Sequence, residues 1–127
     1  MRAVRPKKNL GQHFLTDLNI AKAIAKAIRS SSGGFSAVKA IGLELKERGM
    51  TQVSMNIVDY EKNALYRVLE LIKAEAKRWG ISIAETEVYG MVPAAALLES
   101  TSYYMQIADF DPNQVIELRL LDLLGRD

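Results

Sequence analysis

The residues of this sequence that could carry out chemistry are few, and they exclude several kinds of site. The chain contains no cysteine, which rules out disulfides, thiol nucleophiles and thiolate metal ligands. It contains one histidine, His13, and a single histidine cannot form a histidine-based metal site. We therefore predict no metal site, and the candidates for ligand contacts considered first carry carboxylate, hydroxyl and amide side chains.

Glu87, in the stretch ETEVYGMVP, is the strongest candidate for a ligand contact. The stretch is expected to lie where a strand ends, before a helix that starts at Pro93. A carboxylate at this place can accept two N–H bonds from one edge of a ligand ring. The alternative is an exposed carboxylate at the end of a strand. Gly90 permits either close approach of a ligand or only a turn of the backbone.

Two further candidates, Ser54 and Asn56, are two residues apart in a predicted strand and so share one face of it. They are either ligand contacts or part of an ordinary solvated sheet face.

The first elements that could position these residues are a helix and a hairpin. Asp17 is predicted to cap the helix, and Gly33 and Gly34 to end it. Its apolar stripe consists of Ile20, Ile24, Ala27 and Ile28. Residues 47–49 are predicted to form the turn of the hairpin. The predicted apolar positions are Ile41, Leu43 and Leu45 in the first strand and Val53, Met55 and Ile57 in the second.

A second helix is predicted from about 61 to 79, capped by Asp59 and closed by Gly80. Its predicted buried stripe is Leu65, Val68, Leu69, Ile72, Ala76 and Trp79. A third strand is predicted over 81–88, and Pro93 is placed in the first turn of the next helix. Asp111, Pro112 and Gln114 then predict the capped start of a last helix.

The order of elements predicts an α/β (α+β) fold of the ferredoxin-like type. Helix, strand, strand, helix and strand make up the ferredoxin-like split unit βαββαβ without its first strand, and two C-terminal helices follow. We expect the first strand to be missing or to be supplied by residues 9–15.

Length and charge set further limits. A chain of 127 residues is one domain by length, and its net charge of +2 does not indicate nucleic acid as a partner. Four basic residues lie within the first eight and form either a solvated tail or an RNA-contacting arm: Arg2, Arg5, Lys7 and Lys8. No apolar run could span a membrane and no secretory leader is present, so we expect no membrane partner and a cytoplasmic location.

Four stretches carry a resemblance to a known family: IAKAIAKAIRSSSGGF, VKAIGLELKERGMTQVSMNIVDYEK, AETEVYGMVPAAALL and FDPNQVIELRL. They span about residues 19–122, and this part resembles the C-terminal subdomain of glutamate formimidoyltransferase. The resemblance implies two ferredoxin-like subdomains with folate in a tunnel between them. It also implies transfer of a formimino group from N-formiminoglutamate to tetrahydrofolate, in histidine degradation and one-carbon metabolism.

The resemblance implies roles for particular residues. Glu87 matches a polar position near the pterin, with Gly90 beside it. Ser54 and Asn56 lie on the face turned toward the partner subdomain and the tunnel. The catalytic histidine of the family belongs to the N-terminal subdomain, so no catalytic residue is assigned here and His13 is not given that role.

Residues 1–18, MRAVRPKKNLGQHFLTDL, resemble the start of a ribosomal RNA adenine dimethyltransferase. In that family Gln12, His13 and Leu15 would help to bind S-adenosylmethionine. However, no G-x-G turn follows a strand in this chain, so S-adenosylmethionine is not expected. We therefore divide the chain into a basic leader, 1–18, and a formiminotransferase-like domain, 19–127.

The sequence predicts a folate-contacting subdomain that is inactive alone, with folate as ligand and tetrahydrofolate as substrate. Its partner would be an N-terminal formiminotransferase subdomain in trans, or a second copy. The alternative is a non-catalytic module that self-associates through its open sheet. A weaker alternative is an RNA-associated factor that uses the basic leader.

Overall fold

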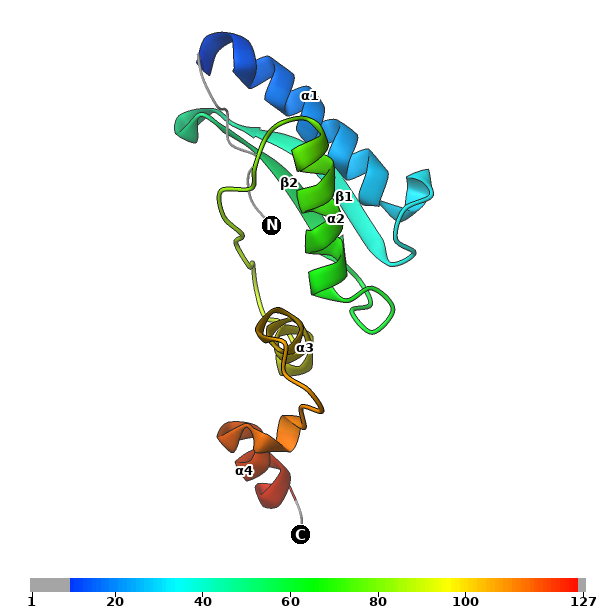
Figure 1. Cartoon of the computed structure of the whole chain (residues 1–127), viewed down its shortest axis with the longest axis vertical. Coiled ribbons are helices and arrows are strands. Elements are labelled where there is room, and N and C mark those ends of the chain that lie inside the picture. The colour runs from blue at the N-terminus through cyan, green and yellow to red at the C-terminus, as the bar shows by residue number, and fades with distance from the viewer. Residues whose placement is uncertain (1–9, 126–127) are drawn as a thin grey trace. The chain divides into compact units, whose positions relative to one another are not determined.

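The computed structural model describes the backbone of residues 10–125 and the side chains of residues 18–125 (Figure 1). The chain divides into two compact units, Met1–Met91 and Val92–Asp127. The first unit contains α1 (Leu10–Ile28), β1 (Val38–Leu45), β2 (Met50–Ile57) and α2 (Leu65–Arg78). The second contains α3 (Ala94–Met105) and α4 (Ile116–Leu124). The described residues also form three short 3-10 turns: η1 (Ser30–Ser32), η2 (Lys46–Arg48) and η3 (Pro112–Gln114).

The two strands form the predicted hairpin. β1 and β2 are antiparallel and pair one to one, from Val38 opposite Ile57 to Leu45 opposite Met50. The turn between them contains η2 and then Gly49, whose φ of 61° lies in the left-handed region. The predicted turn at residues 47–49 is therefore confirmed.

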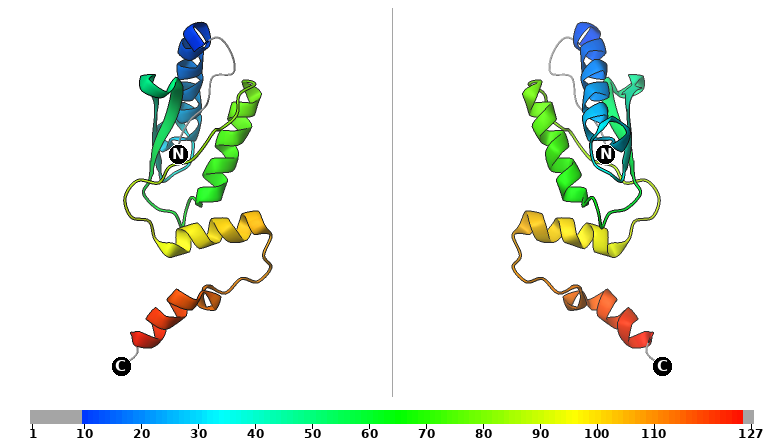
Figure 2. Two further views of the ribbon diagram at one scale, coloured as in Figure 1. Left: turned by 90° about the vertical axis from the view of Figure 1, so that its left-hand side faces the viewer. Right: turned by 90° about the vertical axis from the view of Figure 1, so that its right-hand side faces the viewer.

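Helices α1 and α2 pack on one face of this hairpin (Figure 2). The core that they share with the strands is made of Ile20, Ala21, Ile24, Ala25, Ile28, Val38, Ala40, Val53, Val68, Ile72, Ala76 and Ile81. The opposite face of the hairpin is covered by neither of the two described helices of this unit.

The contact between α1 and β1 is unusually close at Gly42. A Cβ atom added at Gly42 would lie 2.6 Å from the backbone nitrogen of Lys22 and 2.8 Å from the carbonyl carbon of Ala21. Ala21 itself is fully buried. The helix backbone can therefore rest directly on the strand only because residue 42 has no side chain.

The predicted apolar face of β1 is wrong. Ile41 and Leu43 are exposed by 53% and 39%, whereas Val38 and Ala40 are in the core. The close approach of α1 requires small side chains under the helix, so the smaller set faces inward. For β2 the prediction was correct, because Val53 is buried and Met55 and Ile57 pack against the core.

Helix α1 begins earlier than predicted. It starts at Leu10, so Asp17 lies inside the helix and does not cap it. Of the two alternatives for the first strand, its supply by residues 9–15 is wrong for residues 10–15, which are helical; Asn9 lies outside the described residues. The leucine and phenylalanine residues at 10, 14 and 18 recur every four positions, which is helical spacing. In the apolar stripe Ala27 is exposed, and Ala21 and Ala25 are buried instead.

Helix α2 buries three of the six residues of its predicted stripe, Val68, Ile72 and Ala76, and its ends differ from the prediction. Asp59 caps a turn before the helix by accepting bonds from the N–H groups of residues 61 and 62, and Ala64 is the N-cap.

The C-terminal end of α2 is closed by Gly80, as predicted. Gly80 has a φ of 74°, and the Ile81 N–H donates to the Ala76 carbonyl over 3.0 Å, which is the Schellman arrangement. This turn carries Ile81 into the core and leaves Trp79 49% exposed, so the predicted burial of Trp79 is wrong.

The strand predicted over residues 81–88 is not formed. Only Ile83 makes a β-bridge, and the remainder of the stretch has no regular structure. In a ferredoxin-like unit the last strand pairs with the first, and residues 10–15 do not supply a first strand. Residues 81–88 therefore have no ladder partner within the described part of the chain.

Asn63 joins the loop before α2 to the start of β1. Its buried side-chain oxygen accepts a 2.6 Å bond from the Ala37 N–H. This bond satisfies a buried backbone donor next to the first core residue of β1.

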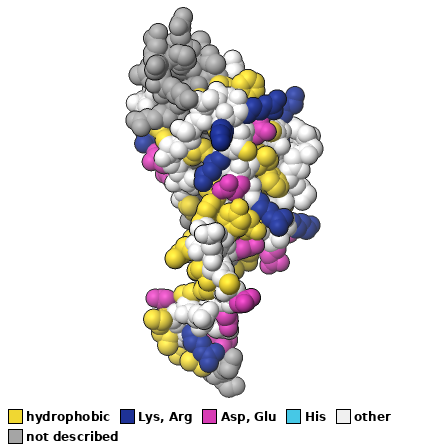
Figure 3. Space-filling view, in the orientation of Figure 1, with side chains coloured by type: hydrophobic (Ala, Val, Ile, Leu, Met, Phe, Trp, Pro, Cys, Tyr) yellow, Lys and Arg dark blue, Asp and Glu magenta, His cyan; other side chains and the backbone are white. Residues whose placement is uncertain are grey.

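The second unit contains the two predicted C-terminal helices. Pro93 is the N-cap of α3, one position before the helix rather than in its first turn. Large apolar side chains of α4 lie at the surface (Figure 3, lower part), and those exposed by more than half are Ile116, Leu120, Leu121 and Leu124.

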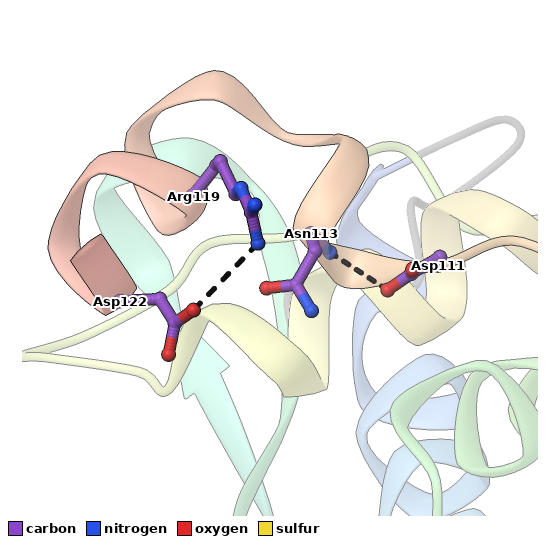
Figure 4. A network of polar contacts seen from close by, with 4 residues as sticks. All are labelled: Asp111, Asn113, Arg119 and Asp122. Carbon is purple, nitrogen blue, oxygen red and sulfur yellow. Dashed lines mark hydrogen bonds and ion pairs between the residues drawn. The ribbon is translucent and has the colours of Figure 1, made fainter. Parts of the chain in front are cut away.

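The predicted capping box before α4 is confirmed. The Asp111 side chain accepts a 2.9 Å bond from the Asn113 N–H (Figure 4). The Gln114 side chain accepts a 3.1 Å bond from the Asp111 N–H, which completes the box. The box caps η3, and α4 follows after Val115. An exposed ion pair of 3.8 Å joins Arg119 and Asp122 on α4 (Figure 4).

The fold is a mixed α/β arrangement in which an antiparallel pair of strands carries two helices on one face, followed by two C-terminal helices. It is compatible with a ferredoxin-like split unit, of which the described residues form the helix, strand, strand, helix portion.

We predict that Gly42→Ala destabilises the protein. The backbone φ of Gly42 is not positive, so alanine fits the strand conformation, but its Cβ would collide with the backbone of α1. The free energy of unfolding should fall by about 2 kcal/mol, as for an overpacked core. Urea denaturation followed by circular dichroism measures this change.

Gly125→Ala is the matched control, because its added Cβ meets no atom closer than 3.4 Å. Its effect should be less than about 0.5 kcal/mol. A Gly42→Ala protein at least as stable as the parent would contradict the close contact, since alanine is otherwise preferred over glycine in a strand.

Candidate functional site

The candidate site begins with the face of the hairpin that α1 and α2 do not cover. The strand register places Lys39 opposite Asn56, Ile41 opposite Ser54 and Leu43 opposite Gln52 on this face, which we call the outer face. Lys39, Ile41, Leu43 and Asn56 are exposed, and Ser54 and Gln52 are half-buried. The outer face therefore combines two apolar side chains with hydroxyl, amide and ammonium groups.

The strand brings two of the sequence-predicted site residues together. Ser54 and Asn56 both point to the outer face, because Val53, Met55 and Ile57 alternate with them and face the core. The prediction that these two residues share a face of a strand is confirmed. Their role in binding stays a prediction.

The other two candidates lie in the segment that follows α2. Glu87 is half-buried, and its carboxylate oxygen Oε2 is fully buried. Gly90 has a φ of 73°, and a Cβ added there would meet no atom within 4 Å. The left-handed backbone conformation therefore favours glycine at this position, whereas close packing of a neighbouring group does not require it. There is open space beside Gly90.

An ion pair ties this segment to the hairpin. Arg48, in the turn between the strands, lies 2.8 Å from Glu85, two residues before Glu87. Both side chains are nearly half exposed, so the pair contributes little to stability, about 0–1 kcal/mol, but it links the segment to the turn of the hairpin. The sequence does not predict this pair, because no local pattern links two positions that lie 37 residues apart.

Other features of the sequence do not enter this site. The basic residues of the leader and the side chain of His13 lie outside what the structure describes. Within that described part, no group of three or more His, Asp or Glu side chains is placed to hold a metal ion. Nor does the described part contain a helix with the length and apolar character needed to cross a membrane.

Comparison with known proteins identifies the class of domain. The family model of the formiminotransferase domain matches residues 9–123. This chain therefore belongs to the formiminotransferase domain family. The match includes residues 9–18, which we had assigned to the leader.

Particular relatives agree with this family. The chain is 48% identical over 106 residues to a glutamate formimidoyltransferase of Streptococcus pyogenes, which covers 83% of this chain and 36% of that protein. It is 39% identical over 105 residues to a glutamate formimidoyltransferase of Thermoplasma acidophilum, with 83% and 35% covered. The chain thus spans about a third of the length of each of these two relatives.

The resemblance to a methyltransferase is weaker and partial. The ribosomal RNA small subunit methyltransferase A of Flavobacterium johnsoniae is 37% identical over 82 residues, which cover 65% of this chain and 28% of that protein.

We predict that Glu85→Gln loosens the segment that carries Glu87 and leaves overall stability nearly unchanged. Loss of an exposed ion pair should change the free energy of unfolding by less than about 1 kcal/mol. Amide hydrogen exchange of residues 84–90 should become about two- to fivefold faster, because the tether to Arg48 is lost. Mass spectrometry of exchanged peptides measures this.

The matched control is Glu70→Gln, which removes an equally exposed pair with Lys73 on α2. The control should not alter exchange in residues 84–90. Equal effects of the two substitutions on this segment would show that the Arg48–Glu85 pair does not position it.

Proposed function

We propose that this chain is the folate-contacting C-terminal subdomain of a glutamate formimidoyltransferase and that it does not catalyse transfer alone. The proposal rests first on membership of the formiminotransferase domain family. The family reaction, by the resemblance, moves a formimino group from N-formiminoglutamate to tetrahydrofolate. A cytoplasmic location and a place in histidine degradation are part of the same proposal.

The observation that carries this proposal is the composition of the outer face. A folate has a flat heterocycle and an aromatic ring, which need apolar surface together with a few polar groups that fix orientation. Ile41 and Leu43 expose apolar surface in the middle of the outer face. Ser54, directly opposite Ile41, adds a hydroxyl that can donate or accept a hydrogen bond.

Groups that could bind the two ends of a folate are also present. Asn56 and Lys39 lie opposite each other at one end of the outer face, so an amide and an ammonium group are available there for a carboxylate tail. Glu87 would contact the pterin edge through the carboxylate oxygen other than the buried Oε2. The space beside Gly90 leaves room for the ring to approach the backbone.

This set of residues can bind and orient, but it does not include a general base suited to the reaction. The formimino carbon must pass through a tetrahedral centre while protons move, which a histidine near neutral pH does best. The resemblance assigns that histidine to the N-terminal subdomain. We therefore propose that activity requires that subdomain as a partner, with this chain contributing position rather than proton transfer.

A second candidate function, self-association without catalysis, is favoured by the same exposed apolar residues. Ile41 and Leu43 are neighbours on a face that neither α1 nor α2 covers. Exposed apolar surface of this kind is also typical of interfaces between subunits. Folate binding distinguishes the two functions.

We expect the purified chain to bind a stable reduced folate, 5-formyltetrahydrofolate, in a calorimetric titration. Glu87→Ala should weaken binding by about tenfold or more, because it removes charge-assisted hydrogen bonds to the pterin. Glu61→Ala, which alters an exposed glutamate in the loop before α2, is the control and should bind like the parent.

A folded chain that does not bind the reduced folate would contradict the proposal. Equal binding by the Glu87→Ala and parent proteins would leave folate binding intact but remove Glu87 from the site.

A further inference from the structure

Exposed apolar side chains gather in the segment that follows Glu87. Residues 84–93 form neither helix nor strand, and they leave the end of α2 as an irregular stretch of chain (Figure 1). Within this stretch Val88 is 56% exposed, Tyr89 is 77% exposed and Met91 is completely exposed. Single apolar side chains at a surface are ordinary, but a group of them is typical of a binding site.

Tyr89 is the member of this group that carries a flat ring, and it is the most exposed of the five tyrosines of the chain. Tyr60 and Tyr66 are half-buried. Tyr103 and Tyr104 are 49% and 43% exposed and contact each other edge to face, with ring centroids 5.2 Å apart. Tyrosine is usually more buried than Tyr89 is, because its ring is largely apolar. The ring of Tyr89 therefore has a face open to a ligand.

The chain just before Tyr89 is linked to the rest of the first unit. Glu85 forms its 2.8 Å ion pair with Arg48, and the Oε2 atom of Glu87 is buried. Open space follows at Gly90, where an added Cβ would meet no atom within 4 Å. A tyrosine side chain has only two rotatable angles, so it presents a large contact area and loses little conformational freedom on binding. Tyr89 thus combines an open ring, a linked backbone and room beside it.

The spacing of Tyr89 and Glu87 determines which part of a folate the ring could reach. Two residues of chain span at most about 7 Å, so the two side chains start close together. A bicyclic ring held at its edge by the Glu87 carboxylate is therefore within reach of the Tyr89 ring. The benzoyl ring of a folate lies one linker further from that edge, and the glutamate lies further still. The pterin is the part that the two residues can contact together.

We propose that Tyr89 stacks on the pterin ring of the ligand and sets the plane of that ring, while Glu87 binds its edge. This inference rests on the proposed function, to which it adds a residue that orients the substrate. Offset stacking of two flat rings is favourable beyond the area that it buries. An edge contact alone leaves a ring free to turn about its hydrogen bonds, and a stacked ring removes that freedom. Tyr89 therefore prepares the pterin for transfer by orientation and moves no proton.

The first test compares two substitutions of Tyr89 in calorimetric titrations of the full chain with 5-formyltetrahydrofolate. Tyr89→Phe keeps the ring and should bind within about twofold of the parent, whereas Tyr89→Leu removes the ring and should bind about tenfold more weakly. Tyr103→Leu alters an exposed tyrosine of the second unit and is the matched control, which should bind like the parent. Failure of Tyr89→Phe to retain binding would overturn the inference, because the hydroxyl and not the ring would then be the contact.

A second test uses the two halves of the ligand, pterin and p-aminobenzoylglutamate, as separate probes. Nuclear magnetic resonance should show the carbon-bound ring protons of pterin shifting upfield with the parent and with Tyr89→Phe, because a stacked aromatic ring shields them. The shift should be absent with Tyr89→Leu. The affinity for p-aminobenzoylglutamate should be the same for the parent and Tyr89→Leu, which a general loss of structure in the segment would not produce.

The outcomes separate this inference from the proposed function. A folded parent that does not bind 5-formyltetrahydrofolate overturns the proposed function, and the role of Tyr89 with it. A parent that binds the reduced folate, together with a Tyr89→Leu protein that binds it equally well, overturns the stacking inference alone. Pterin protons that do not shift upfield in the presence of a folate-binding parent overturn it as well.

Discussion

The close contact of α1 with β1 at Gly42 is the constraint on which the first unit depends. The helix backbone lies where a Cβ of residue 42 would be, and Ala21 is fully buried beside it. This distance determines which side chains fit between helix and sheet. Small residues such as Ala40 face the helices, and Ile41 and Leu43 face outward. The apolar part of the proposed folate site is thus a consequence of how tightly the opposite face is packed.

The sequence predicted the elements of this unit better than their faces. Alternate residues of β1 form two sets that could face the core. Hydrophobicity favours the set with the larger side chains, which includes Ile41 and Leu43. In the structure the set with the smaller side chains faces the core, because glycine and alanine allow the helix to approach the strand. On α1, Ala21, whose backbone lies against Gly42, is buried, and Ala27 is exposed. Size complementarity between two elements cannot be read from either element alone.

The wrong predictions of strands at residues 81–88 and 10–15 have a related cause. A strand forms only where another strand pairs with it, and its own sequence does not show whether one does. Residues 81–88 have a strand-like composition but form a single bridge, at Ile83. Residues 10–15 extend α1, so they do not provide the partner. The local patterns were more reliable where the chain closes its own hydrogen bonds. The hairpin turn at Gly49, the Schellman turn at Gly80 and the capping box at Asp111 all occur where predicted.

The candidate site combines the outer face with the segment that Arg48 and Glu85 tie to the hairpin, and its direct test is a map of ligand contacts. Amide chemical shifts of the labelled full chain should be followed by nuclear magnetic resonance during addition of 5-formyltetrahydrofolate. The account predicts that shifts concentrate at Ile41, Ser54, Asn56 and residues 85–90. Shifts confined to the outward surfaces of α1 and α2, or none in a folded chain, would contradict it.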